Sequence, residues 1–181
     1  MRVLIPLADG VEELEAVTLI DVLRRGGIDV VSVALGSELA VRGSRGVTLL
    51  ADALWETLDI DSFDAITLPG GGEGTENLSD DPRIIETVQE FDNAGKFVTA
   101  ICAAPTVLAQ ADILGDRRAT CYPACAEILG ESYDDAPVIA DGNIITSQGP
   151  GTAMLFALVL VRHFAGDETA HSVASGLLAS F

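Results

Sequence analysis

The chain has 181 residues, of which 49% are hydrophobic, and this length and composition are typical of one globular domain. Its net charge at pH 7 is −18, from 28 acidic and 10 basic residues, which disfavours a basic patch for nucleic acid. No apolar run reaches the roughly eighteen residues of a membrane span, so no membrane association is predicted. Three cysteines without a secretory signal predict a reducing, cytoplasmic setting.

The acid excess has two interpretations. It is compatible with an ordinary soluble surface whose charges repel one another. It is also compatible with a halophilic host, because an acidic surface with few lysines stays hydrated in a high-salt cytoplasm. Lys96 is the only lysine in the chain, and the other basic residues are arginines.

Short apolar runs alternate with helical patterns along the whole chain. This alternation predicts a single α/β domain over residues 1–181, with a mostly parallel sheet covered by helices on both faces. A β excursion with a glycine-rich turn is expected at 36–50 and a short irregular or helical piece at 55–63. The predicted strands are 2–7, 29–35, 65–68, 97–101, 119–121, 138–141 and 144–146, and the predicted helices are 11–25, 82–94, the segment from Cys102 to 111, 148–164 and 167–176.

One cysteine stands where a strand meets a helix. The apolar run 97–101 stops at Cys102, and small residues and Pro105 follow it. This pattern predicts a strand, a sharp turn and a helix, the cysteine counterpart of a serine nucleophile elbow. Ligands gather at the carboxyl ends of parallel strands, and a helix N-terminus favours a thiolate over a thiol. Cys102 is therefore the candidate nucleophile.

A glycine cluster follows the predicted strand 65–68. The run Pro-Gly-Gly-Gly-Glu-Gly at 69–74 lacks the lysine and the serine or threonine of a phosphate-binding P-loop. It is either a tight connection between a strand and a helix, or a loop whose backbone N–H groups turn toward Cys102. In the second case these groups would form an oxyanion hole with the amide that follows the cysteine.

Three acids follow the first predicted strand and are candidate proton carriers. Glu12, Glu13 and Glu15 are either surface acids that compensate the helix dipole or partners of Cys102. The second interpretation arises because the ends of the first and fourth strands can be neighbours in a doubly wound sheet. Neither His163 nor His171 follows a strand, so a complete cysteine–histidine–acid triad is not supported.

Two further cysteines lie near each other in sequence. Cys121 and Cys125 are four residues apart without a histidine between them or beside them, so no metal site is predicted. Two buried small side chains are the simpler interpretation. The alternative is that Cys121 acts as a resolving thiol.

Taken together, six segments resemble the ThiJ/PfpI superfamily, also called DJ-one. The resemblance is to its small branch, which contains a parkinsonism-associated deglycase and bacterial and archaeal relatives. It covers nearly the whole chain in the right order. The matching segments are Asp-Gly-Val-Glu-Glu-Leu-Glu at 9–15, Asp-Val-Leu-Arg-Arg-Gly-Gly-Ile at 21–28, Ser-Arg-Gly-Val at 44–47, Leu-Pro-Gly-Gly at 68–71, Ala-Ile-Cys-Ala-Ala-Pro at 100–105 and Thr-Ser-Gln-Gly-Pro-Gly-Thr at 146–152.

The resemblance implies a flavodoxin-like fold, usually in a homodimer, and an activity without a cofactor. The family's reactive cysteine falls on Cys102 and its hydrogen-bonding carboxylic acid on Glu15. Its oxyanion amides fall on Gly71 and Ala103. The remaining implied pocket residues are Arg45, Tyr122, Gly149 and Pro150, with Arg25 contributed by the partner subunit.

Two departures from the family narrow the expected chemistry. Tyr122 stands where many members carry a histidine, and Ala103 stands where the peptidase-like branch carries another. The His-x-Glu of related glutaminases is also missing, so peptidase and glutaminase activities are disfavoured. The resemblance implies a glyoxalase or deglycase acting on methylglyoxal, glyoxal and their adducts, with a role in carbonyl and oxidative stress. The alternative is a non-enzymatic redox sensor or stress chaperone that works through oxidation of Cys102.

Overall fold

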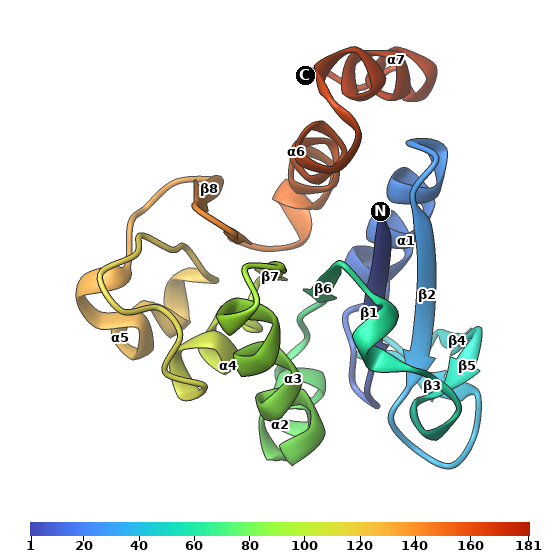
Figure 1. Ribbon diagram of the computed structural model, residues 1–181, viewed down its shortest axis with the longest axis vertical. Helices are drawn as coiled ribbons and strands as arrows, with labels where there is room; N and C mark the ends of the chain where they lie inside the picture. The colour runs from blue at the N-terminus through green and yellow to red at the C-terminus, as the bar shows by residue number, and fades with distance from the viewer.

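A seven-stranded sheet runs through the middle of the computed structural model, which describes residues 1–181 (Figure 1). Every neighbouring pair of strands is parallel except the last, which is an antiparallel hairpin. The strand order is β5 (Ala53–Leu54), β2 (Asp29–Ala34), β1 (Arg2–Leu7), β6 (Ala65–Leu68), β7 (Phe97–Ile101), β9 (Ile144–Ser147) and β8 (Val138–Asp141). The predicted mostly parallel sheet is confirmed.

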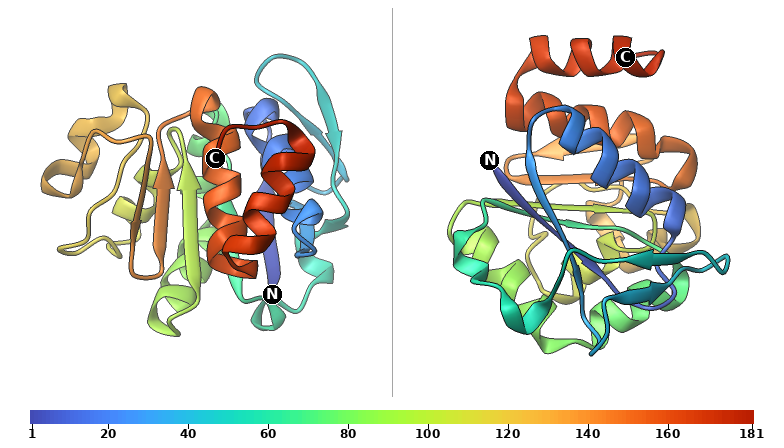
Figure 2. Two further views of the ribbon diagram at one scale, coloured as in Figure 1. Left: turned by 90° about the horizontal axis from the view of Figure 1, so that it is seen from above. Right: turned by 90° about the vertical axis from the view of Figure 1, so that its right-hand side faces the viewer.

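Helices cover both faces of this sheet (Figure 2). On one face lie α1 (Glu13–Arg25) and α6 (Ala153–Ala165), with α7 (Asp167–Leu177) packed on the outside of α6. On the other face lie α2 (Gly72–Asp80), α3 (Pro82–Asn93) and α4 (Pro105–Gln110), while the short α5 (Ala126–Leu129) belongs to a peripheral excursion. None of these helices is both long and apolar enough to span a membrane.

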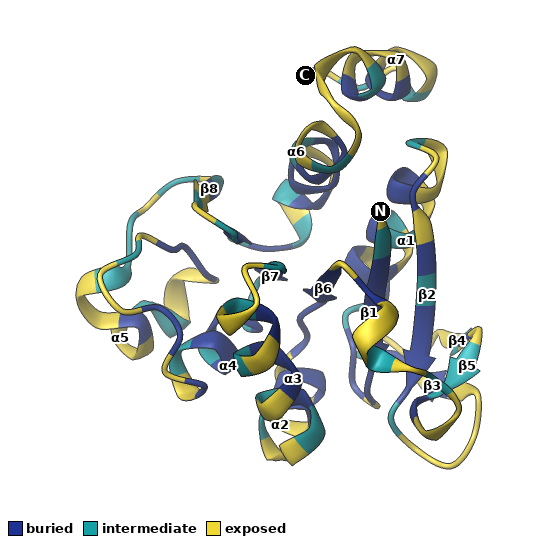
Figure 3. Ribbon diagram, in the orientation of Figure 1, coloured by how far each residue is buried: buried dark blue, intermediate teal, exposed yellow.

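The buried strands separate two hydrophobic clusters, one on each face (Figure 3). Leu19 of α1 and Phe156 of α6 belong to the first cluster, and Phe91 of α3 and Leu108 of α4 belong to the second. Because both faces are covered, buried residues follow one another along the parallel strands rather than alternating, as from Val3 to Leu7 in β1.

A small antiparallel hairpin stands apart from the main sheet. It consists of β3 (Ala40–Arg42) and β4 (Thr48–Leu50), and it confirms the β excursion expected at 36–50. Its connecting loop, residues 43–47, returns to the beginning of α1, where the Ser44 N–H donates to the Val11 carbonyl over 2.8 Å. The hairpin loop therefore lies beside the first strand's carboxyl end.

Two expected elements differ from the sequence pattern. Residues 119–121 do not form a strand, because Ala119 makes only an isolated bridge to Tyr133. Residues 72–80, expected as a connection, form α2 despite its glycines. A Cβ atom on Gly74 would lie 2.7 Å from the Val11 backbone nitrogen, so this glycine is required by close packing rather than by a turn.

Candidate active site

Cys102 occupies a strained turn between β7 and α4. Its φ angle is 65°, in the left-handed region that residues other than glycine seldom adopt. The turn is held because the Cys102 N–H donates to the Ser147 carbonyl of β9 over 2.9 Å. The sharp turn predicted from the sequence is confirmed, and it presents a half-buried thiol at the carboxyl end of β7.

Glu15 reaches this thiol from α1 and is fully buried. Its Oε2 accepts a hydrogen bond of 2.8 Å from the Gly70 N–H, and its Oε1 is buried without another hydrogen-bond partner. The sequence analysis allowed the ends of the first and fourth strands to be neighbours. In the structure they are not, because β6 lies between β1 and β7. Glu15 and Cys102 instead meet over Gly70, which follows β6.

The two groups shift each other's pKa. Burial raises the pKa of Glu15 to about 7, against the opposing effects of the Gly70 N–H and the Cys102 thiol. Burial and the Glu15 charge raise the pKa of Cys102 to about 12, against the opposing effects of the Gly71 and Ala103 N–H groups. Because of this coupling, the pair holds one proton between about pH 7 and pH 12.

The expectation that a helix dipole favours the Cys102 thiolate is therefore wrong. The helix α4 has only six residues and begins at Pro105, which carries no N–H group. Burial of the sulfur and the charge of Glu15 disfavour the thiolate, and they raise the pKa of Cys102. The thiol needs a base when it reacts, and the Glu15 carboxylate is placed to be that base.

The Gly71 and Ala103 N–H groups both act to lower the pKa of Cys102, which places them beside its sulfur. Gly71 has a φ angle of 97° and stands immediately before α2. A Cβ atom there would lie 2.3 Å from the Gly10 carbonyl oxygen, so no other residue fits. Two converging N–H groups are the geometry that stabilises a developing oxyanion.

Tyr122 forms the opposite side of the site. Its N–H donates to the Cys102 carbonyl over 2.7 Å, and its side chain is 48% exposed. A Cβ atom on Gly149 would lie 3.3 Å from the Tyr122 ring and 3.9 Å from the Cys102 sulfur. Tyr122, Gly149 and Pro150 line a cavity of about 180 Å³ beside the cysteine.

The two predicted arginines occupy different places. Arg45 lies exposed on the hairpin loop, and its backbone N–H donates to the Glu13 carboxylate. Arg25 lies at the far end of α1 and pairs with Asp21 over 2.6 Å. The structure therefore brings Cys102 together with all the predicted site residues except the two arginines. Arg45 stands on a neighbouring loop, and Arg25 of the same chain is not at the site.

The remaining cysteines and histidines lie outside the site. Cys121 is fully buried in the cluster on the α3 face, whereas Cys102 packs against the cluster on the α1 face. This placement favours a buried small residue over a resolving thiol. His163 packs edge-on against Phe97, at the end of β7 opposite to Cys102. No triad histidine is present at the cysteine.

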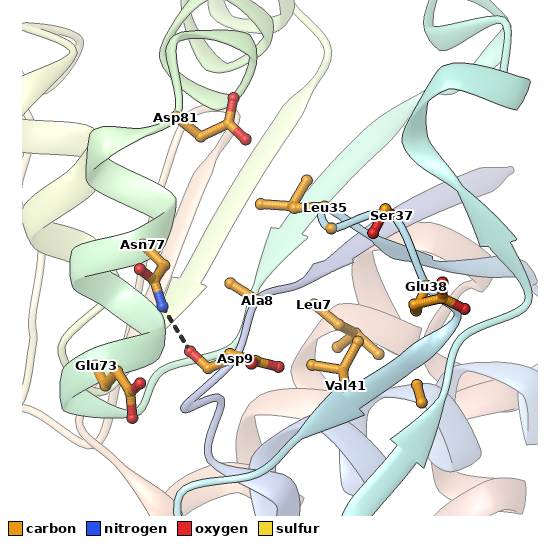
Figure 4. A pocket seen from close by; sticks show the side chains of 12 residues that line it. Leu7, Ala8, Asp9, Leu35, Ser37, Glu38, Val41, Glu73, Asn77 and Asp81 are labelled. Carbon is orange, nitrogen blue, oxygen red and sulfur yellow. Dashed lines mark hydrogen bonds between the residues drawn. The ribbon is translucent and has the colours of Figure 1, made fainter.

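The largest cavity, of about 580 Å³, lies elsewhere, between the carboxyl ends of β1 and β2, the β3 strand and α2 (Figure 4). Asn77 donates to the Asp9 carbonyl across its wall over 2.9 Å. Two of its four acids, Asp9 and Glu73, are already paired with Arg42. None of the predicted site residues lines this cavity, so it is separate from the cysteine site.

Gly70 is the residue of the site that the sequence interpretation missed. A Cβ atom there would lie 2.6 Å from the Cys102 Cβ, 2.8 Å from the Glu15 Oε2 and 2.9 Å from the Ile101 carbonyl oxygen. The run of three glycines at 70–72 was the available signal. It did not distinguish the glycine that the pair requires from Gly72, where a Cβ atom would meet nothing within 4 Å.

This difference gives a matched pair of variants. Gly70→Ala should lose about 1–3 kcal/mol of unfolding free energy, because the new methyl group would clash with Cys102, Glu15 and the Ile101 carbonyl. It should also reduce cysteine-dependent activity at least about 100-fold by displacing the Cys102–Glu15 pair. Gly72→Ala should retain both properties. Urea unfolding and an activity assay on both variants check this, and equal behaviour of the two would contradict the assigned role of Gly70.

Comparison with known proteins agrees with this architecture. The model of the DJ-1/PfpI family matches residues 1–163. The Drosophila melanogaster protein dj-1beta is 40% identical over 181 residues, covering 98% of this chain and 97% of that protein. The Caenorhabditis elegans protein named glutathione-independent glyoxalase DJR-1.2 is 34% identical over 178 residues, covering 97% and 94%. The chain covers only 39% of the longer Arabidopsis thaliana DJ-1 homolog B, to which it is 41% identical over 169 residues.

The solved structure of oxidized Toxoplasma gondii DJ-1 superposes with a TM-score of 0.96 at 35% identity, covering 99% of each chain. This agreement over the whole length confirms the flavodoxin-like fold and the family resemblance read from the sequence. The conclusion from sequence, fold and comparison is that the chain belongs to the DJ-1/PfpI family.

Proposed function

We propose that this chain is a cysteine-dependent glyoxalase or deglycase that acts on methylglyoxal, glyoxal and their adducts without a cofactor. The observation that carries the proposal is the fully buried Glu15 carboxyl, with a pKa of about 7, beside the Cys102 thiol. An acid that is half protonated near neutral pH is suited both to accept and to donate a proton. A relative that is named a glyoxalase supports the same reaction class.

The first step is addition of the thiol to the aldehyde. The Cys102 sulfur forms a bond to the aldehyde carbon as its proton passes to the Glu15 carboxylate. The carbonyl electron pair moves to oxygen, and the Gly71 and Ala103 N–H groups stabilise that oxyanion. Glu15 then returns the proton to the oxygen, and a hemithioacetal results.

The second step moves a proton between neighbouring carbons. Glu15 removes the proton from the hemithioacetal carbon and delivers it to the adjacent carbonyl carbon, while the oxygen proton moves to the other oxygen. The product is a thioester of a 2-hydroxy acid. Water then cleaves the thioester, which releases lactate from methylglyoxal and restores the thiol.

The test is product analysis with methylglyoxal in the absence of added thiol, metal or cofactor. The wild-type chain should release one lactate for each methylglyoxal consumed, measured by NMR or an enzymatic lactate assay. The Cys125→Ala variant should do the same, because Cys125 lies outside the site. Consumption of methylglyoxal without lactate would mean stoichiometric capture of the aldehyde and would overturn the proposed reaction.

The second candidate function is a redox sensor or stress chaperone that depends on oxidation of Cys102. It is favoured by the half-buried position of the thiol among the Gly71 N–H, the Ala103 N–H and Glu15, since a protonated Glu15 would donate to a sulfinate oxygen. Two equivalents of peroxide would add two oxygens to the sulfur and leave water. That mass gain, together with no lactate from methylglyoxal, would favour the sensor.

We further propose a cytoplasmic homodimer. Four apolar side chains of α1 and the β3–β4 hairpin are strongly exposed in the single chain, namely Leu14 at 52%, Val17 at 49%, Val47 at 51% and Leu50 at 75%. Val17 and Leu50 line one shared cavity, so this surface is continuous between the two elements. A second copy of the chain would cover this surface. The resulting dimer would bring Arg25 of each chain to the Cys102 site of its partner.

A further inference from the structure

Glu13 is the second largely buried acid of α1, and it faces the hairpin loop rather than the cysteine. Its side-chain oxygens accept hydrogen bonds from the Arg45 N–H at 2.9 Å, the Ser44 hydroxyl at 3.1 Å and the Val47 N–H at 3.4 Å. The residue is only 8% exposed. One carboxylate thus accepts hydrogen bonds from three of the five residues of the hairpin loop.

The hairpin loop is shaped around this carboxylate. A Cβ atom on Gly43 would lie 2.8 Å from the Glu13 carboxyl carbon, so glycine leaves the room that the acid occupies. Gly46 turns the chain with a φ angle of 88°, and the Gly43 N–H closes the loop on the Val47 carbonyl over 2.8 Å. Burial acts to raise the pKa of Glu13, but the hydrogen bonds from backbone N–H groups and Ser44 outweigh it and lower the pKa.

The hairpin loop adjoins the glycine loop at 70–72 through one shared strip of backbone. The Ser44 N–H donates to the Val11 carbonyl, and on the other side the Glu12 N–H donates to the Gly70 carbonyl over 2.9 Å. The strip from Val11 to Glu12 therefore lies between residues 43–47 and the glycines that contact Cys102. The hairpin loop is therefore separated from those glycines by one segment of backbone.

Arg45 is the residue that this loop leaves without a partner. It is the only one of the ten basic side chains that makes neither a hydrogen bond nor an ion pair. In a chain with 28 acids, an unpaired guanidinium keeps its five N–H donors for oxygen atoms of a ligand. Its backbone, in contrast, is fixed by Glu13.

We propose that Glu13 is a positioning residue, whose carboxylate fixes the hairpin loop so that Arg45 is held at the rim of the Cys102 site to bind substrate oxygens. This inference rests on the proposed function for its substrate and on the contacts of Glu13 for its geometry. The neighbouring Glu12 provides the matched control, because its carboxylate contacts only the Ser44 hydroxyl.

The experiment is a double-mutant cycle on methylglyoxal turnover. Glu13→Gln and Arg45→Ala should each raise KM about tenfold with kcat changed less than about twofold, as expected for a lost hydrogen bond to bound substrate. The double variant should show the same rise in KM of about tenfold, because Glu13→Gln already removes the hydrogen bond from Arg45 to substrate that Arg45→Ala removes. A KM raised about a hundredfold in the double variant, the product of the two single effects, would overturn the inference. A tenfold rise of KM in Glu12→Gln would also overturn it.

Amide hydrogen exchange supplies a readout that does not depend on turnover. Exchange at the Arg45 and Val47 amides should accelerate at least about tenfold in Glu13→Gln, because a neutral amide oxygen accepts more weakly than a carboxylate and the new NH2 group would face the Arg45 N–H at 3.1 Å. Exchange should stay unchanged in Arg45→Ala and Glu12→Gln. Unchanged exchange in Glu13→Gln would overturn the positioning role. If Glu13→Gln does not fold, Glu13→Asp should give the same results, because the shorter acid does not reach the loop. Absence of lactate from the wild type would overturn the proposed function alone, and the exchange result would still decide the role of Glu13.

Discussion

Replacing Cys102 with alanine should reduce lactate formation from methylglyoxal at least about a thousandfold, to the uncatalysed rate. The reaction proposed here begins with a bond from the Cys102 sulfur to the aldehyde carbon, and alanine has no atom that forms it. The two backbone amides would remain and would still bind a carbonyl oxygen, but no covalent intermediate would follow. Lactate release at saturating methylglyoxal is the measurement.

The fold should tolerate this change. Alanine removes only a sulfur that is half-buried, and the Cys102 N–H would still donate to Ser147. The Cys125→Ala variant removes a thiol of similar exposure outside the site and should keep the full rate. Cys102→Ser should also be nearly inactive, because a hydroxyl is a weaker nucleophile beside the same base. Retention of lactate formation in Cys102→Ala would show that another group attacks the aldehyde.

Replacing Glu15 with glutamine should lower the rate of lactate formation by about 10²–10⁴-fold, because glutamine carries no proton between the two carbons. Its amide oxygen would still accept the Gly70 N–H, so the position of the side chain would be kept. The wild-type rate should rise with pH up to about 7, where the Glu15 carboxyl loses its proton. This rise should be absent from the residual activity of Glu15→Gln.

The same variant should be more stable than the wild type at alkaline pH. The pKa of Glu15 is raised from 4.5 to about 7 in the folded chain, so folding favours the protonated form. The stability that this form contributes is fully present below pH 4.5 and is lost as the pH rises to about 7. The shift corresponds to roughly 3 kcal/mol, which glutamine does not lose because it does not ionise.

Urea unfolding at several pH values checks this second effect. The difference between Glu15→Gln and the wild type should be largest at pH 8 and should disappear toward pH 4.5. Glu12→Gln removes the same charge one turn earlier, from a carboxylate that hydrogen-bonds only Ser44, and serves as the control. Because the Glu12 charge contributes to the raised pKa of Glu15, this variant should show a smaller effect of the same sign. A wild type that is more stable than Glu15→Gln at pH 8 would contradict the burial of an acid with a raised pKa.

The sequence alone was sufficient for the class of fold and for the position of Cys102 at a sharp turn. Strands such as 97–101 are short apolar runs with clear ends, and the helix 82–94 has a proline at its start and a glycine after it. These signals are local, since each depends on neighbouring residues only. Cys102 could be placed at a sharp turn for the same reason, because the apolar run stops there and Pro105 follows.

The sequence could not predict which acid works with this cysteine from local signals, and the choice of Glu15 came from the family resemblance. Glu12, Glu13 and Glu15 have the same chemistry and nearly the same position. Only the tertiary structure separates them, since Glu15 is buried against Gly70 and Cys102, whereas Glu13 closes the hairpin loop and Glu12 contacts Ser44. The strand order, which puts β6 between the two partners, is likewise a long-range property.

The glycines and the thiol pKa depended on the tertiary structure for the same physical reason. Gly70, Gly71 and Gly72 are consecutive residues of the same type, so the sequence does not distinguish them. In the structure only Gly70 and Gly71 lie against atoms from distant segments. The helix dipole expected to favour a thiolate is a local effect, and it is outweighed by burial and by a carboxylate that comes from residue 15. Local patterns therefore determined where the Cys102 sulfur lies, and contacts between residues 15, 70 and 102 decided the direction of its pKa shift and its acidic neighbour.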